Sequence, residues 1–198
     1  KMRGKDLITN GSFEKGLESW SAHDTANLSI GSNVSYKGTN SLHVTGRTST
    51  GAGAQQYLTG QMLPGRVYRV SAKVMHDSPT APAARDFNIC IQDGDWQTIE
   101  VMGSGNIIKG KWGTIEGTYT FPENISLDKP RIFVETSWRT EQDPERDLFD
   151  FYLDDVSVVD ITPTEDIVLG ENDYNGQKDS IVLLQPLLEC LRCSKLKM

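Results

Sequence analysis

The stretch that decides the fold is LFDFYLDDVSVVDI, which occupies residues 148–161. It is rich in β-branched and aromatic residues and alternates apolar with polar positions, which is typical of a half-buried strand. The apolar positions are Phe149, Phe151 and Leu153, followed by Val156 and Val158. Side chains alternate with a period of two along a strand, so this set changes side at Asp154 and Asp155. Either the strand is bulged there or one core ends and another begins, and a bulge is favoured within so short a stretch.

The same alternation marks several shorter segments. They lie around residues 41–45, 68–74, 87–91, 115–121 and 132–134, with a glycine-rich stretch at 103–110. Glycine, proline and asparagine turn signals separate them, and no stretch before residue 161 has helical periodicity. Residues 46–54 are too poor in apolar side chains to be core, so we expect a surface loop that carries Arg47. Many short strands with such turns predict an antiparallel β-sandwich.

Composition narrows the classes of function. The chain has 198 residues, 37% hydrophobic and 24% charged, which suits one soluble domain and a tail. A net charge of −7 disfavours nucleic acid as a partner, because that affinity comes from neutralising phosphates. No run approaches the roughly 20 apolar residues that span a bilayer, so we expect no membrane partner. Three cysteines make neither a disulfide framework nor a zinc site.

The two ends of the chain differ from its middle. Residues 1–6 are interpreted as an N-terminal extension, 7–161 as the domain, and 162–198 as a linker or disordered tail. The tail contains a polar, acidic part and a short apolar run interrupted by Pro186. That run is either an amphipathic helix that docks elsewhere or an unstructured end, and the second is favoured. No signal peptide opens the sequence at Lys1, which leaves open a removed leader or an internal fragment.

Several short motifs occur in a characteristic order. They are NGSFE at 10–14, GLESW at 16–20, GTNSL at 38–42, GRT at 46–48, LPGRVY at 63–68, KW at 111–112 and DFYLDDV at 150–156. Over about residues 7–161 the chain resembles the carbohydrate-binding modules of families 4, 9 and 22. The resemblance implies a galactose-binding-domain-like jelly roll of two antiparallel sheets with a ligand groove on one. It also implies a monomeric, non-catalytic module that binds xylan or mixed-linkage β-glucan and accompanies a secreted bacterial glycoside hydrolase, such as an endo-1,4-β-xylanase.

The resemblance further implies a structural calcium ion where the first strand meets the last. Glu14 and Asp155 occupy the matching carboxylate positions, and Ser12 and the Lys37–Asn40 turn would supply further oxygens. Calcium takes about six to eight oxygen ligands, so two carboxylates held near a turn suit it. The alternative is that Asp154 and Asp155 only solvate the end of a strand.

A groove that binds sugar needs aromatic rings and polar groups. Sugar rings stack on aromatic faces, and their hydroxyls need amides, carboxylates and arginines. Alternation alone places Asn88 and Gln92, and Phe133 and Glu135, away from the core. Against the family pattern, His23 stands where an arginine is expected, Gly51 where a tryptophan is expected and Phe133 where a tyrosine is expected, while Glu135 is kept.

Two further aromatics could compensate for the missing tryptophan. Trp96 and Trp138 follow the strands that carry Gln92 and Glu135. Each is a candidate sugar contact or a packing residue. Arg47 either binds sugar or braces its own loop, and His23 is either a ligand or a loop residue. The candidate sugar-binding set is Glu135, Trp138, Trp96, Gln92, Asn88, Phe133, Arg47 and His23, with Cys90 as an unreactive residue of the groove floor.

Two other functions compete with a sugar-binding module. A glycoside hydrolase would need two carboxylates flanking a cleft at about 5 Å or about 6.5–9.5 Å. The carboxylates of this chain instead cluster in turns and at the proposed calcium corner. An adhesion or protein-interaction domain on the same fold is the remaining alternative, because the expected aromatic set is depleted.

Overall fold

The computed structural model describes residues 4–94, 98–164, 167–168 and 182–183. The chain divides into two compact units, Lys1–Ile161 and Thr162–Met198. In the second unit, β11 (Ile167–Val168) and β12 (Val182–Leu183) pair antiparallel. The expected linker or tail otherwise lies largely outside the described residues.

The first unit is built almost entirely of strands. They are β1 (Ser21–His23), β2 (Asn27–Gly31), β3 (Ser41–Thr45), β4 (Gly53–Tyr57), β5 (Val67–Met75), β6 (Ala84–Asp93), β7 (Thr98–Ile108), β8 (Gly113–Thr120), β9 (Arg131–Thr136) and β10 (Phe151–Asp160). Its described residues include one short helix, α1 (Pro144–Asp147), which begins after Asp143, whose side chain accepts hydrogen bonds from Glu145 N and Arg146 N. Among the described residues, no helix has the length and apolar character needed to cross a bilayer.

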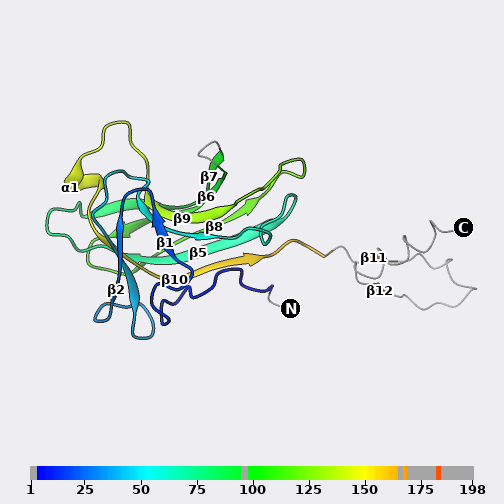
Figure 1. Ribbon diagram of the computed structural model, residues 1–198, viewed down its shortest axis with the longest axis horizontal. Helices are drawn as coiled ribbons and strands as arrows, with labels where there is room; N and C mark the ends of the chain where they lie inside the picture. The colour runs from blue at the N-terminus through cyan, green and yellow to red at the C-terminus, as the bar shows by residue number, and fades with distance from the viewer. Residues whose placement is uncertain (1–3, 95–97, 165–166, 169–181, 184–198) are drawn as a thin grey trace, which may run out of the picture. The chain divides into compact units, whose positions relative to one another are not determined.

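The strands form two layers. Their order is β1-β4-β9-β6-β7-β8-β5-β10-β3-β2, and every pairing is antiparallel. A single register pair, Ser104 with Glu116, joins β7 to β8. There the sheet turns over, so that β9, β6 and β7 lie above β5 and β10 in Figure 1. We call β1-β4-β9-β6-β7 the first layer and the remaining strands the second layer. The two-layer β-sandwich predicted from the turn pattern is confirmed.

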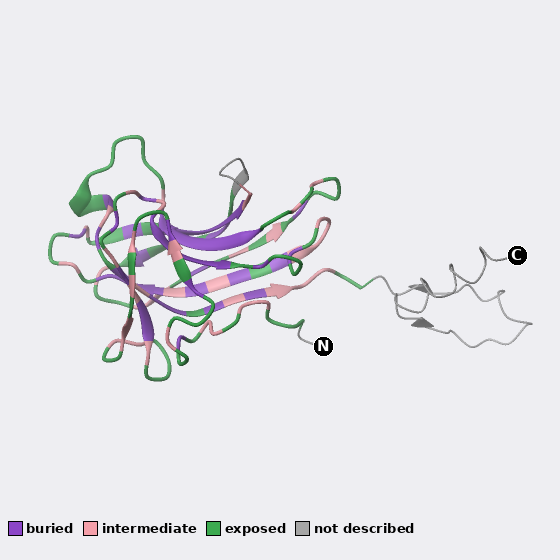
Figure 2. Ribbon diagram, in the orientation of Figure 1, coloured by how far each residue is buried: buried purple, intermediate pink, exposed green. Residues whose placement is uncertain are grey.

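The core lies between the layers, and strands of both layers carry buried residues (Figure 2). Phe87, Ile89 and Ile91 of β6 are buried, as the alternation predicted. Tyr68, Val70, Ala72 and Val74 of β5 are buried in the second layer.

The bulge predicted in β10 is confirmed. The register between β10 and β5 shifts between Asp154 and Ser157, and Asp155 has a φ of 48°. The apolar residues on both sides of the shift are all buried: Phe149, Phe151, Leu153, Val156 and Val158. The carboxylate that the bulge turns inward is that of Asp154, which accepts hydrogen bonds from Tyr36 N, Lys37 N and Asp155 N.

The expected surface loop at residues 46–54 is wrong in part. Arg47, Thr50, Ala52 and Ala54 are buried, and β4 begins at Gly53. A Cβ on Gly53 would lie 2.0 Å from Val134 O of the neighbouring β9. The small residues of this segment therefore allow the backbones of β4 and β9 to pack closely. A count of large apolar residues does not detect such packing.

The alternation also did not indicate β7, because glycines interrupt it. A Cβ on Gly103 would lie 2.6 Å from Glu116 C, and a Cβ on Gly117 would lie 2.2 Å from Met102 O. These two glycines let β7 and β8 approach closely where the sheet turns over.

Candidate functional site

The outer face of the first layer brings together most of the predicted sugar-binding residues. Asn88 is opposite Glu135 across β6 and β9, and Phe133 is opposite both Cys90 and Gln55. Gln92 lies further along the same face of β6. Alternation therefore placed these side chains on one continuous surface, as predicted.

Much of this surface is covered by His23, the last residue of β1. Its imidazole stacks on the Phe133 ring with the two centroids 3.7 Å apart and the planes 7° apart. His23 Nδ1 lies 2.6 Å from Gly51 O, and Nε2 lies 2.6 Å from Gln92 Oε1. Phe133 is only 1% exposed. His23 is thus a strand residue and not a loop residue, and Phe133 offers no free ring face.

Arg47 braces the interior of the domain. Nε donates to Ala52 O, Nη1 donates to Asp147 O and Phe149 O, and Nη2 donates to Thr50 O and Thr136 Oγ1. All five N–H groups of the guanidinium are used. Burial lowers the pKa of Arg47 to about 10. These contacts favour the bracing alternative, because the guanidinium has no donor left for a sugar.

Glu135 is a buried carboxylate on the outer face. Burial raises its pKa, although hydrogen bonds from Cys90 and Asn88 and the charges of Arg47 and Arg85 partly oppose the rise. Cys90 Sγ donates to Glu135 Oε1 over 3.3 Å. Burial and the Glu135 charge raise the pKa of the Cys90 thiol, which keeps it protonated and unreactive, as predicted for a residue of the groove floor.

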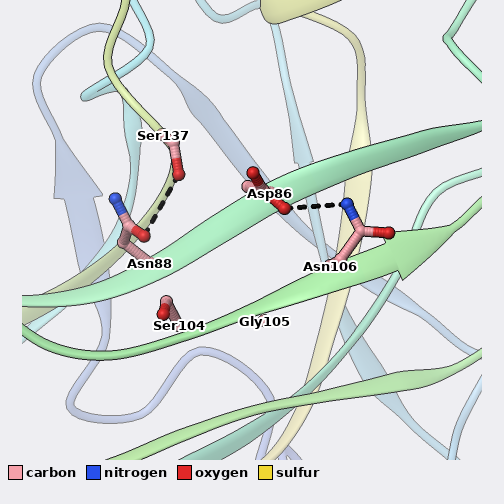
Figure 3. A pocket seen from close by; sticks show the side chains of 6 residues that line it. All are labelled: Asp86, Asn88, Ser104, Gly105, Asn106 and Ser137. Carbon is pink, nitrogen blue, oxygen red and sulfur yellow. Dashed lines mark hydrogen bonds between the residues drawn. The ribbon is translucent and has the colours of Figure 1, made fainter.

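Beside Glu135 lies an open hollow of about 270 Å³. Its lining is polar apart from one glycine and comprises Asp86, Asn88, Ser104, Gly105, Asn106 and Ser137 (Figure 3). Asn106 Nδ2 donates to Asp86 Oδ1 over 2.7 Å, and Ser137 Oγ donates to Asn88 Oδ1 over 3.1 Å. Asn88 alone belongs to the predicted set. The register could have indicated the others, since Asp86 pairs with Asn106 and Asn88 with Ser104.

Exposed aromatic rings stand near two ends of this face. Trp138 follows Ser137 directly and is 68% exposed. Tyr57 is half-exposed at the end of β4, with the Arg131 guanidinium 5.4 Å from its ring centroid. The predicted contact Trp96 lies outside the described residues. An exposed ring on the residue that follows Ser137, which lines the polar hollow, has the chemistry that sugar recognition requires.

The comparisons with known proteins agree with this chemistry. Residues 5–143 match the sequence profile of a family described as "Carbohydrate binding domain". The chain belongs to this family. Membership confirms the predicted resemblance and the prediction of a non-catalytic binding module.

Curated relatives of this carbohydrate-binding domain include two xylanases. Over 172 residues the chain is 29% identical to endo-1,4-beta-xylanase A of Thermotoga maritima and 30% identical to that of Thermotoga neapolitana. Each match covers 83% of this chain but 15% of the relative, so the chain spans a small part of the length of these enzymes.

The fold is shared with solved xylan-binding domains. The CBM22-2 domain from Paenibacillus barcinonensis Xyn10C superposes with a TM-score of 0.66 at 24% identity, covering 76% of this chain and 97% of that one. A second domain, described as a xylan-binding domain from CBM 22, has a TM-score of 0.65 at 21% identity, covering 78% and 95%. At these identities the likeness establishes the fold, which is the predicted jelly roll.

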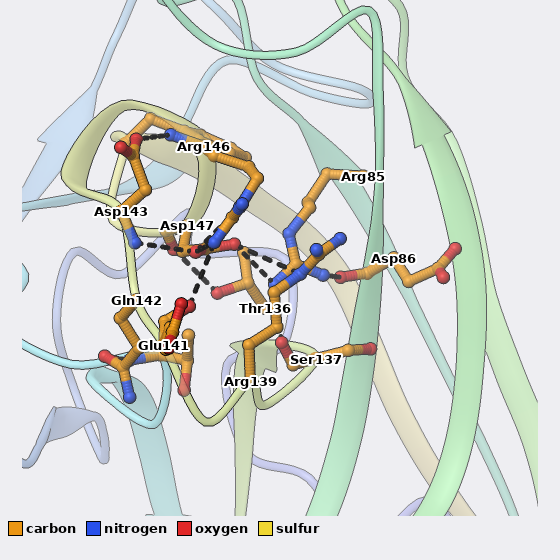
Figure 4. A network of polar contacts seen from close by, with 12 residues as sticks. Arg85, Asp86, Thr136, Ser137, Arg139, Glu141, Gln142, Asp143, Arg146 and Asp147 are labelled. Atoms are coloured by element: carbon orange, nitrogen blue, oxygen red, sulfur yellow. Dashed lines mark hydrogen bonds and ion pairs between the residues drawn. The ribbon is translucent and has the colours of Figure 1, made fainter.

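An ionic network around the buried carboxylate of Asp147 adjoins the hollow of the carbohydrate-binding domain at Ser137 (Figure 4). Asp147 is fully buried, and its carboxylate lies 3.0 Å from Arg85 Nη2, 3.4 Å from Arg139 Nε and 3.0 Å from Arg146 Nη2. Burial raises the pKa of Asp147, but hydrogen bonds and these cations outweigh it, so the pKa lies below its ordinary value. Arg85 Nη2 also donates to Ser137 O over 2.5 Å, which fixes one wall of the hollow.

The predicted calcium ligands lie on three chain segments that converge. Glu14 Oε1 accepts hydrogen bonds from Thr39 N and Asn40 N, both over 2.9 Å. Val156 N donates to Gly11 O over 3.0 Å, so the segment of Ser12 lies beside that of Asp155. The described residues contain no group of three or more His, Cys, Asp and Glu side chains that could hold a metal. The predicted set has only two carboxylates and needs other oxygens to be complete.

Proposed function

We propose that this domain binds xylan at the hollow beside Trp138 and thereby holds an attached xylan-degrading enzyme on its substrate. The observation that carries the proposal is the hollow itself, because amide, hydroxyl and carboxylate groups line it. In this proposal the domain is secreted and monomeric. Tethering raises the local concentration of an enzyme at its substrate without any new catalytic contact.

The lining supplies both kinds of polar partner that sugar hydroxyls need. Asp86 offers acceptor oxygens, and Asn88 and Asn106 carry amides with both donor and acceptor capacity. Two lining pairs are already hydrogen-bonded to each other, which holds these groups in place before a sugar arrives. The exposed indole of Trp138 is wide enough to stack on the apolar face of a sugar ring.

The choice of xylan rests on the relatives. Two curated relatives are named endo-1,4-beta-xylanase, and one structural neighbour, from Clostridium thermocellum, is described as complexed with xylohexaose. Mixed-linkage β-glucan is the second glycan that we expect to bind.

Electrophoresis through native gels that contain xylan, β-glucan or no polysaccharide tests this function. Xylan should retard the wild-type protein, and Trp138→Ala and Asn106→Ala should each weaken retardation by about tenfold, equivalent to about 1.4 kcal/mol. Tyr36→Ala is the matched control, because Tyr36 is also an exposed aromatic residue but contacts Trp112 and Lys73, away from the hollow. Migration of the wild-type protein that no polysaccharide changes would favour the adhesion or protein-interaction alternative.

We also propose a structural calcium ion where the segments of Glu14, the 37–40 turn and Asp155 meet. One carboxylate oxygen of Glu14 is held by two backbone N–H groups, whereas Oε2 has no partner among the described residues. Asp155 is exposed and has a left-handed backbone, so its carboxylate is free to turn to the ion. Ser12, Lys37 and Asn40 would contribute oxygens, and the ion would clamp the first and last segments of the domain.

Calorimetry with and without chelator tests the calcium proposal. An ion that binds only the folded state stabilises it by about 2.7 kcal/mol at 100 times its Kd. In a domain of this size that corresponds to a Tm roughly 5–10 °C higher in calcium than in chelator. Glu14→Gln should remove the difference, and Glu18→Gln, an exposed carboxylate nearby, should keep it. Equal Tm values of the wild-type protein in calcium and in chelator would refute the proposal.

A further inference from the structure

The stacked pair of His23 and Phe133 occupies the centre of the outer face of the first layer. The two rings are nearly parallel, and a sugar ring that stacks on an aromatic residue lies in the same way. His23 is 3% exposed, so the imidazole fills the space above Phe133. Opposite His23 in the register is Gly53, and His23 Nδ1 lies 2.6 Å from Gly51 O, so the segment that leads into β4 holds the imidazole in this position.

Three buried polar atoms around this pair have no hydrogen-bond partner among the described residues. They are Gln55 Oε1, Gln92 Nε2 and Arg131 Nε. All three residues are more than nine-tenths buried. Gln55 is directly opposite Phe133, and Gln92 is opposite Arg131 on the adjoining strand. Buried polar groups are usually paired, so three unpaired ones on residues that neighbour Phe133 on these strands point to a missing partner.

One polar group of the Gln92 amide is without a partner among the described residues, whichever way the amide is oriented. If His23 is neutral and Nδ1 donates to Gly51 O, then Nε2 accepts, and the Gln92 amide must turn its NH₂ group towards it. The carbonyl oxygen of Gln92 is then unpaired. If both ring nitrogens donate, the NH₂ group is unpaired instead. In either arrangement one half of a buried amide remains available to a ligand.

The strand that carries His23 is well placed to move. β1 is three residues long, lies at one end of the strand order and is hydrogen-bonded only to β4 among the described strands. Short edge strands open at a lower free energy than the strands at the centre of a sheet.

We propose that His23 is an access-determining residue that closes a central sugar subsite on Phe133. The subsite comprises the Phe133 ring and the unpaired groups of Gln55, Gln92 and Arg131. When a β-linked pyranose chain is longer than the hollow, one of its sugar rings displaces the His23 imidazole and stacks on the Phe133 ring in its place. This inference rests on the proposed function, since it extends the same site from the hollow of Asn88 towards Gln92.

Titration calorimetry with xylotriose and xylohexaose tests the proposal by chain length. His23→Ala should raise the affinity for xylohexaose about five- to tenfold, because the displacement of the imidazole no longer opposes binding. The affinity for xylotriose should not change. His43→Ala is the matched control, because His43 stacks on Tyr152 in the second layer at 4.2 Å and 5° and should alter neither affinity. An unchanged or lower affinity of His23→Ala for xylohexaose would overturn the proposal.

A second measurement uses the unmutated protein and does not depend on the folding of a variant. In the NMR spectrum of the free protein, the Phe133 ring current should shift the ring protons of His23 upfield. Saturating xylohexaose should remove that shift and leave the signals of His43 in place. Binding without a change at His23 overturns this inference and leaves the proposed function intact. If the His23→Ala variant binds xylohexaose and the wild-type protein does not, this inference is supported and the open hollow is overturned as the site. If neither protein binds xylohexaose, both the inference and the proposed function are overturned.

Discussion

At the scale of single residues, the least expected feature is Glu135, a buried carboxylate without an ion pair among the described residues. Its folded-state pKa lies above its ordinary value, mainly because of burial. Such a group stabilises the fold fully below its unfolded pKa, and that contribution is lost as the pH rises through the folded pKa. Above its folded-state pKa the ionised side chain therefore opposes folding.

Glu135→Gln should accordingly raise the Tm at pH 7. The advantage over the wild-type protein should shrink as the pH falls towards 4, where the wild-type side chain is protonated as well. Thermal melts of both proteins across this pH range check the prediction, with Glu141→Gln as an exposed control. An advantage that grows as the pH falls would show that burial does not control the ionisation of Glu135.

The sequence predicted on which face of the sheet the side chains of the site lie, but not how exposed those side chains are. Alternation correctly placed Asn88, Gln92, Phe133 and Glu135 on the outer face. It could not reveal that His23, more than a hundred residues earlier in the sequence, covers Phe133. Burial depends on contacts between distant segments, and a local pattern carries no information about them. For the same reason the polar lining of the hollow became visible only through the strand register.

At the scale of elements, strands were predicted correctly from the sequence where large apolar residues alternate with polar ones. The change of parity in LFDFYLDDVSVVDI indicated the bulge of β10, because only a bulge keeps Leu153 and Val156 in the same core. It failed for β4 and β7, where glycines and alanines replace large side chains. Such residues favour loops in sequence patterns, but here they permit close contact between backbones.

The crossing of β7 and β8 gives a prediction at this scale. Gly103→Ala would place a Cβ 2.6 Å from a backbone atom of β8, which no side-chain rotation can relieve. We expect a loss of about 1–3 kcal/mol in the free energy of unfolding, as for other overpacked sites. Ser104→Ala, one position along the strand, should cost much less. Urea denaturation measures both, and equal stabilities would mean that the strands can separate freely at this point.

At the scale of the whole molecule, the jelly roll is complete within the first unit. The change in composition after Thr162 coincides with the division between the two units. Among the described residues, those of the hydrophobic core and those packed against it lie between Leu7 and Val158. We therefore expect the sandwich to fold without the segment that follows.

A chain shortened to residues 1–161 should therefore fold and bind by itself. Ile161 N donates to Val67 O over 2.8 Å, and the shortened chain keeps this hydrogen bond. We expect one cooperative melting transition with a Tm within about 3 °C of the full chain, because the division between the two compact units falls at Ile161. Retardation by xylan should also match that of the full chain, since the hollow and Trp138 are retained. A broad transition or a much lower Tm would show that residues 162–198 complete the fold of the domain.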